Sequence, residues 1–203
     1  MIRLAQKIAL WGMGPMSSIK LSSEDQQTCL QVAKQSIEHG LQQGSALLVT
    51  TIDYSPNLQQ QLATFVTLHK QGELRGCIGA LEAYQPLIND VAEHAYAAAF
   101  RDPRFSAVSE NEYKQLEVEI SVLGKPVVID FTDEDDLLNQ LRPGIDGLIL
   151  EYGSNRGTFL PTVWEQLPDK IDFFNHLKNK AGLPMDWWQD DVEVSRYETF
   201  SFS

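Results

Sequence analysis

The chain has 203 residues, 43% of them hydrophobic and 22% charged, a balance typical of one globular domain. Its formal net charge of -12 at pH 7 argues against a broad nucleic-acid or anionic-membrane surface, because phosphate binding depends on clustered Lys and Arg. No segment approaches the roughly 18 consecutive apolar residues of a membrane-spanning helix. Two cysteines are too few for a disulfide framework or a four-thiolate zinc site, so we expect a reducing, cytoplasmic location.

The first 20 residues are expected to form an N-terminal extension, with residues 21–203 as a single domain. Arg3 and Lys7 precede a short apolar stretch that imitates a secretory signal peptide, yet no clear small-residue cleavage site follows. Met13 and Met16 are alternative starts. The segment therefore carries no prediction of secretion.

The first half of the domain is predicted to hold one helix, a strand and a hairpin. Ser23 with Gln26 has the spacing of a capping box, which predicts a helix over residues 24–39. Cys29 falls on the apolar stripe of that helix, so we expect it to pack in the core. Strands are expected at residues 46–52, 62–69 and 74–78, the last two joined by a turn at Gln71-Gly72.

The second half of the domain alternates helices with short strands. The acidic run 132–136 could suggest a metal site, but acids after a threonine also favour a helix N-terminus. The other expected elements are a helix from Pro86 to about Asp102, a strand 117–123, a hairpin 147–152 with 158–160, a helix from Asp169 and a last strand 192–200. This order predicts the α+β class, with largely antiparallel pairing and flanking helices.

The segment Glu73-Leu-Arg-Gly-Cys-Ile-Gly79 closely resembles the signature of the AMMECR domain family, whose prokaryotic members are called AmmeMemoRadiSam system protein A. Further blocks agree in order, at residues 98–105, 119–123, 144–148, 157–161 and 180–183. The resemblance covers roughly residues 21–202. This sequence departs from the family pattern at Thr162-Val163-Trp164, where the family more usually has a glutamine and a smaller residue after the proline. The resemblance implies two lobes with a cleft between them. It implies no established reaction, and the family name implies a radical-SAM protein and a Memo-like protein as partners.

Cys77 is the first candidate for chemistry. In an extended strand, Arg75 and Cys77 would share one face, where a guanidinium favours the thiolate over the thiol. Gly76 and Gly79 would let a ligand or another backbone approach closely. The alternative is that Cys77 is a small buried hydrophobe and that the glycines only permit a bulge or a tight crossing.

Nucleophilic catalysis also needs a base, and the chain has four histidines, His39, His69, His94 and His176. We expect His94 to be the best of them, because it lies near the inward face of the helix that starts at Pro86. A packing role is the alternative for this histidine.

Further polar candidates lie on either side of a proline and on a strand. Asp102 and Arg104 flank Pro103, where they could bind a ligand or hold the turn rigid. Glu119 and Ser121 are expected to point away from the core, and Glu119 could act as an acid or base or could pair with Arg75.

Two functions are compatible with these residues. The first is a small enzyme, or an enzyme component, that acts on a small organic substrate in the cleft, with Arg75 orienting an anionic group, Cys77 as nucleophile and Glu119 as acid or base. The second is a non-catalytic binding module for a radical-SAM or Memo-like partner. Trp187-Trp188 could offer an aromatic patch to a protein partner, and the equal alternative is that both tryptophans cap the core. Neither metal-ligand spacing nor a phosphate-binding fingerprint occurs, so we expect no metal and no cofactor.

Overall fold

The fold is built on two antiparallel sheets of four strands each. The computed structural model describes residues 21–203, so the expected N-terminal extension lies outside the described residues. The first sheet has the strand order β2-β1-β3-β8, with β1 at Thr64–Lys70, β2 at Glu73–Gly79, β3 at Leu116–Leu123 and β8 at Thr199–Phe202. The second has the order β4-β7-β5-β6, with β4 at Val127–Val128, β5 at Gly147–Tyr152, β6 at Asn155–Phe159 and β7 at Glu193–Tyr197.

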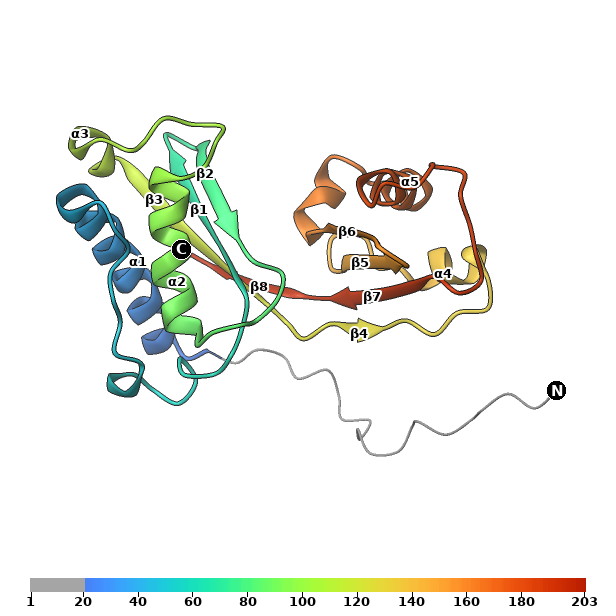
Figure 1. The fold of residues 1–203 in the computed structure, drawn as a ribbon, viewed down its shortest axis with the longest axis horizontal. Coiled ribbons are helices and arrows are strands. Elements are labelled where there is room, and N and C mark those ends of the chain that lie inside the picture. Colours follow the sequence, from blue (N-terminus) through green and yellow to red (C-terminus); the bar gives the residue numbers. More distant parts are fainter. Residues whose placement is uncertain (1–20) are drawn as a thin grey trace.

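One long antiparallel ribbon joins the two sheets. Strand β3 continues into β4, and β7 continues into β8, and both connections cross between the sheets in Figure 1. The backbone N–H of Gly124 donates to Glu198 O at 2.8 Å, and that of Ile129 donates to Val194 O at 2.8 Å, so pairing persists through the crossing. The first sheet extends from the β3 side of this ribbon and the second from its β7 side.

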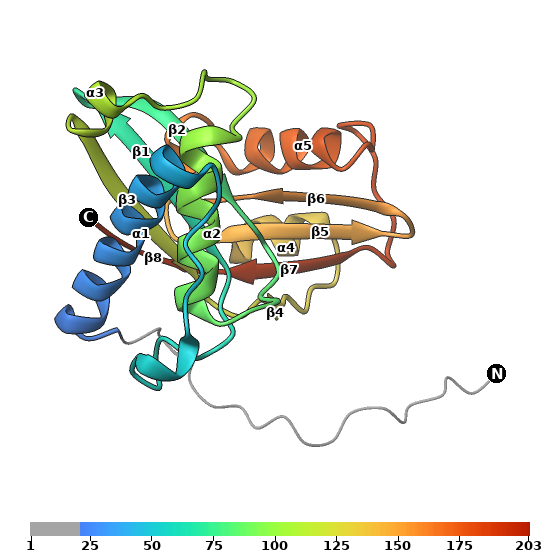
Figure 2. The same cartoon turned by 60° about the vertical axis from the view of Figure 1, so that its left-hand side comes forward.

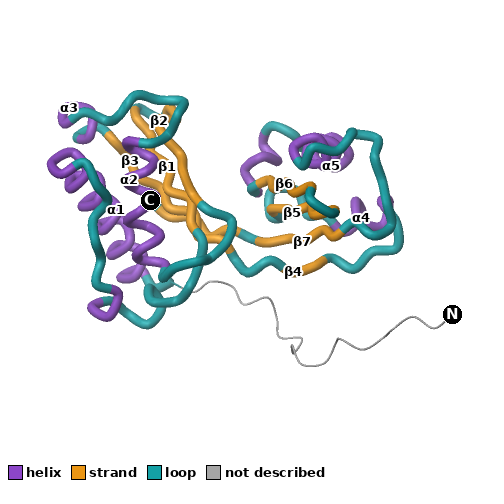
Figure 3. Tube along the Cα trace, viewed as in Figure 1, coloured by secondary structure: helices purple, strands orange, loops and turns teal. Residues whose placement is uncertain are grey.

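Helices cover each sheet on one side. Figures 1 and 2 show α1 (Ser23–Gln43) and α2 (Leu87–Phe100) on the same side of the first sheet. The second sheet carries α4 (Glu134–Gln140) and α5 (Lys170–Lys180), and the tube in Figure 3 shows the long loops between these elements. The short elements are η1 (Thr51–Asp53), α3 (Glu110–Tyr113) and η2 (Pro161–Glu165). None of the helices in residues 21–203 combines the length and apolarity that crossing a membrane requires.

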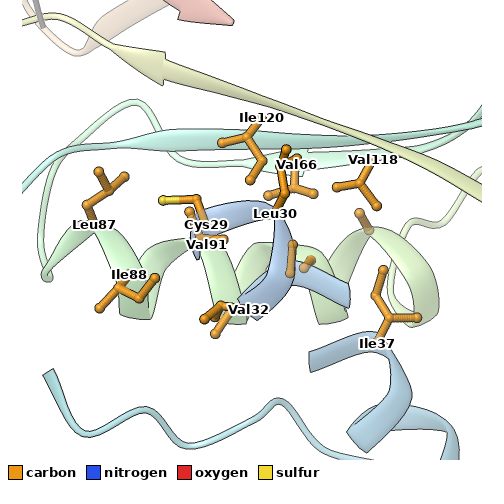
Figure 4. Packing of buried hydrophobic residues seen from close by; sticks show 14 of the residues in the cluster. Cys29, Leu30, Val32, Ile37, Val66, Leu87, Ile88, Val91, Val118 and Ile120 are labelled. Atoms are coloured by element: carbon orange, nitrogen blue, oxygen red, sulfur yellow. The ribbon is translucent and has the colours of Figure 1, made fainter. Parts of the chain in front are cut away.

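Separate hydrophobic cores support the two sheets. In the first, Cys29 is fully buried between the helices and the sheet beside Leu87 and Val91 (Figure 4), which confirms its packing role. The second core forms around Phe173 and Phe174 of α5. A small third cluster, which contains Ala63, Leu123, Ile149 and Tyr197, combines residues of both sheets. The α+β class with antiparallel sheets and flanking helices is thus confirmed, whereas the cleft remains a prediction.

Two local predictions were wrong. Helix α1 is capped by Ser22, because the Ser22 hydroxyl oxygen accepts a hydrogen bond from the Asp25 N–H. The Asp25 carboxylate in turn accepts hydrogen bonds from the Ser22 N–H and from the side chains of Ser55 and Asn57. Residues 46–52 do not form a strand. Side chains from other segments form hydrogen bonds with the backbone of residues 46–52 instead. For example, Asn89 Nδ2 donates to Val49 O at 3.1 Å.

Gly76 allows α2 to lie directly against β2. A Cβ atom at this position would be 2.3 Å from the backbone oxygen of Ala98, which is far closer than van der Waals contact. The backbone of a packed helix moves only at a cost in free energy. Gly76→Ala is expected to lower the free energy of unfolding by about 2–3 kcal/mol, as measured by urea denaturation. Leu74→Ala, on the same strand with a side chain 43% exposed, is the control and should cost less than about 1 kcal/mol. Equal stability of the Gly76 variant and the parent would contradict this packing.

Candidate functional site

A row of polar side chains crosses the face of the first sheet that α1 and α2 leave uncovered, which we call the open face. In the observed register Cys77 pairs with Thr67, and Thr67 pairs with Glu119. Their strand neighbours Val66 and Ile120 are fully buried in the core beneath the helices. Because successive side chains of a strand point to opposite faces, Cys77, Thr67 and Glu119 lie together on the open face.

Cys77 is the accessible thiol of the chain. Its side chain is half-buried, and the Thr67 hydroxyl donates a hydrogen bond to its Sγ at 3.2 Å. Cys29, by contrast, is fully buried, and burial together with the charge of Asp25 raises the pKa of its thiol to about 12. Thiol chemistry in the folded chain is therefore restricted to Cys77.

Asp102 and Arg104 close the outer edge of β2 at Cys77. The Cys77 backbone N–H donates to Asp102 Oδ2 at 2.8 Å, and Arg104 Nη2 donates to the Cys77 carbonyl at 3.3 Å. At the edge of the sheet the backbone N–H and carbonyl of Cys77 would otherwise face solvent, and each now has a hydrogen-bond partner. The two side chains also bind each other, with Arg104 Nη2 and Asp102 Oδ2 2.7 Å apart.

Asp102 stays ionised in this arrangement. Its side chain is almost fully buried, and the hydrogen bond from Arg104 holds the pKa of the carboxyl far below its usual range, with help from the Cys77 N–H. The charged pair fixes the backbone at Cys77 and places a guanidinium, whose side chain is 53% exposed, beside it. The Asp102-Pro103-Arg104 turn thus has a definite structural role at the site.

Arg75 does not face Cys77, contrary to the expectation from simple alternation. A β-bulge opposite Leu68 and His69 leaves Arg75 as the extra residue of β2, which interrupts the period of two. Its guanidinium forms a two-pronged ion pair with Glu112 of α3, at 2.8 and 3.0 Å, and also donates to Ser106 O at 2.8 Å. The cation beside Cys77 is Arg104 instead.

His94 lies on the other side of the first sheet from Cys77. Its Nδ1 is 3.1 Å from Asp90 Oδ2 and 3.2 Å from the Thr64 hydroxyl, in a buried cluster between α2 and β1. Asp90 in turn accepts hydrogen bonds from the Thr64 N–H and hydroxyl. This cluster fastens the helix to the strand, so His94 cannot reach the Cys77 thiol.

The histidine on the open face is His69. It lies two residues beyond Thr67 on β1, which places it on the same face, about 7 Å along the strand. It pairs across the sheet with Glu117 of β3. The alternation of strand 62–69 puts His69 on the face opposite to Val66 and Leu68, but only the strand pairing shows that Cys77 shares this face.

Glu119 and Ser121 are half-buried on β3, on the same face. Glu119 lies two strands from Cys77, about 10 Å between Cα atoms, and its proposed partner Arg75 is bound to Glu112 instead. The Ser121 and Ser201 hydroxyls are 2.8 Å apart.

Gly79 on β2 permits a close contact between strands, since a Cβ there would be 2.3 Å from Thr64 O.

Comparison with known proteins places these residues in a family context. The AMMECR1 family model matches residues 30–202. A protein of Methanothermobacter thermautotrophicus is 38% identical over 189 residues, covering 92% of this chain and 98% of its own length, and one of Methanopyrus kandleri is 34% identical over 191 residues, covering 90% of each. The crystal structure of an uncharacterized protein from Pyrococcus horikoshii superposes with a TM-score of 0.75 at 33% identity, over 85% of this chain and 88% of that one.

The Arg75–Glu112 pair makes stability depend on acid pH. The hydrogen bond from Arg75, with a smaller one from Lys70, lowers the pKa of Glu112 from 4.5 to about 2. A depressed folded-state pKa contributes stability that is present above the unfolded pKa and lost as pH falls through the folded one. Glu112→Gln should therefore cost about 2 kcal/mol at pH 7, and this difference should shrink between pH 4.5 and about 2.

Urea denaturation of parent and variant across that pH range measures the difference. Glu110→Gln is the control, because Glu110 is exposed on the same short helix and has no ion pair among residues 21–203. A Glu112 difference that does not change between pH 7 and pH 2 would refute the ion pair as its source.

Proposed function

Since the chain belongs to the AMMECR1 family, we propose that it binds a small organic molecule on the open face of the first sheet, with Cys77 as the reacting thiol. The observation that carries this proposal is the position of Cys77. Its backbone is held at 2.8 Å by the Asp102 carboxylate while its Sγ lies in a half-buried polar row. A residue that served only packing would lie on the apolar, helix-covered face.

The neighbouring groups have complementary chemical roles. Arg104 is half-exposed and fixed by Asp102, so it takes the role of orienting an anionic group of the substrate that the sequence had suggested for Arg75. A thiol becomes a nucleophile when a base accepts its proton. His69, on the same face, and Glu119, in the same row, are the two candidate bases.

A non-catalytic binding role is the second candidate. The observation in its favour is that several large apolar side chains are exposed away from the open face, among them Val128, Ile171 and Met185, as at surfaces that bind proteins. A radical-SAM or Memo-like protein would be the partner implied by the family. This role needs a complementary surface and no accessible thiol, so the reactivity of Cys77 distinguishes the two functions.

Iodoacetamide should modify one cysteine in the folded protein and both after denaturation, as counted by mass spectrometry. The fast site should disappear in Cys77→Ser, because Cys29 is fully buried and has a raised thiol pKa of about 12. Arg104→Leu should slow alkylation of Cys77 by the anionic reagent iodoacetate by about threefold or more, since the half-exposed guanidinium beside Cys77 attracts the carboxylate of the reagent.

Arg101→Leu is the matched control for Arg104. It removes the same charge three residues away, and its guanidinium lies over the Tyr96 ring, 5.0 Å from the centroid. Its rate should equal that of the parent. A Cys77 that reacts only when the protein unfolds would reject the thiol role and leave the non-catalytic function.

A further inference from the structure

A continuous groove runs between α4 and α5, on the second sheet and separate from the open face. Two hollows of about 360 and 540 Å³ lie there side by side, and both are lined by Asp135, Leu138 and Ile171. One hollow extends to Met185 and Asp186, and the other extends to Pro143 and Pro168. We call this surface the α4–α5 groove.

The floor of the groove is apolar and open to solvent. Ile171 is 57% exposed and Met185 42% exposed, and the half-buried Leu138 lines the same hollow. The opposite side of α5 carries Phe173 and Phe174, which are buried in the second core. Ile171 of α5 therefore points away from this core, and with Leu138 and Met185 it forms an apolar surface that has no cover within residues 21–203.

Carboxylates surround this apolar floor. The groove is lined by four acidic residues, Glu134, Asp135, Asp169 and Asp186, and by two lysines, Lys170 and Lys178. Among the ion pairs of residues 21–203, none involves Asp135 or Asp186. An occupant that brought positive charge would find these two carboxylates available.

The two lysines offset only part of the charge of the four acids. Lys178 is almost fully buried, and its ammonium is used within the fold by Glu134, Asn175 Oδ1 at 3.2 Å and Met185 O at 3.0 Å. Lys170 spans the groove to donate to Asn139 O at 3.3 Å. The groove thus presents exposed apolar groups between acidic walls.

We infer that the α4–α5 groove binds a cationic amphipathic helix of a protein partner. A helix of this kind would place apolar side chains against Ile171, Leu138 and Met185, and its Lys or Arg residues beside Asp135 and Asp186. Two facing helices commonly form the groove for such a segment, and opposite charge steers it into place. An anionic membrane or a nucleic acid would be repelled by the same carboxylates.

The test uses two fluorescein-labelled synthetic helices of 18 residues, one of leucine and lysine in heptad spacing and one with glutamate in place of lysine. Anisotropy with the full chain should show saturable binding of the lysine peptide and none of the glutamate peptide. The double variant Asp135→Lys with Asp186→Lys should weaken lysine-peptide binding at least tenfold, and Ile171→Ser should weaken it at least fivefold.

Matched controls separate the groove from the overall negative charge. Glu73→Lys with Glu110→Lys changes the net charge by the same amount at two exposed positions of the first sheet's half, and Leu48→Ser removes an apolar side chain that is 95% exposed there. Neither control should change the affinity by more than about twofold, since distant exposed sites act independently. Equal weakening by groove and control variants would overturn the proposal.

Two other occupants would also overturn it. If Arg3→Glu with Lys7→Glu strengthens binding of the lysine peptide, the groove is assigned to the chain's own first residues. If the parent sediments as a dimer and Ile171→Ser as a monomer, the groove is assigned to a second copy. Because no residue of the open face is altered, these results do not depend on the chemistry of Cys77.

Discussion

The Asp102 carboxylate controls the outer edge of the first sheet. It accepts the N–H of Cys77 and is held by Arg104, so the backbone of β2 is paired although no further strand follows it. The close approach of α2 to Gly76 places this carboxylate at the required depth, because the turn that carries it follows directly from the helix. The geometry of the thiol therefore depends on a charged group outside the strand.

The shared ribbon explains why the two candidate surfaces lie on separate parts of the molecule. Since β3–β4 and β7–β8 belong to both sheets, each sheet grows outward from one side of the ribbon and keeps its own core. The open face around Cys77 belongs to the first sheet, and the α4–α5 groove belongs to the second. A ligand on one surface and a partner on the other could bind at the same time.

Periodicity and turn chemistry predicted most of the fold, including the hairpin at Gln71-Gly72 and the buried position of Cys29. The sequence could not reveal the bulge that turns Arg75 toward Glu112, because a bulge depends on how two strands pair and not on either strand alone. The sequence also favoured His94 over His69, because it does not show how the helices and the sheet are assembled. A helix stripe shows that a residue is inward, but only the assembled sheet shows which of its faces the helix covers.

The exchange rate of the Cys77 amide hydrogen, followed by NMR in deuterated buffer, tests the role of Asp102 most directly. The account predicts slow exchange in the parent, because the amide donates to a buried carboxylate, and exchange faster by at least tenfold in Asp102→Ala. If the amide exchanges in the parent as fast as an unpaired edge amide, Asp102 does not hold the strand. The geometry assigned to Cys77 would then be wrong.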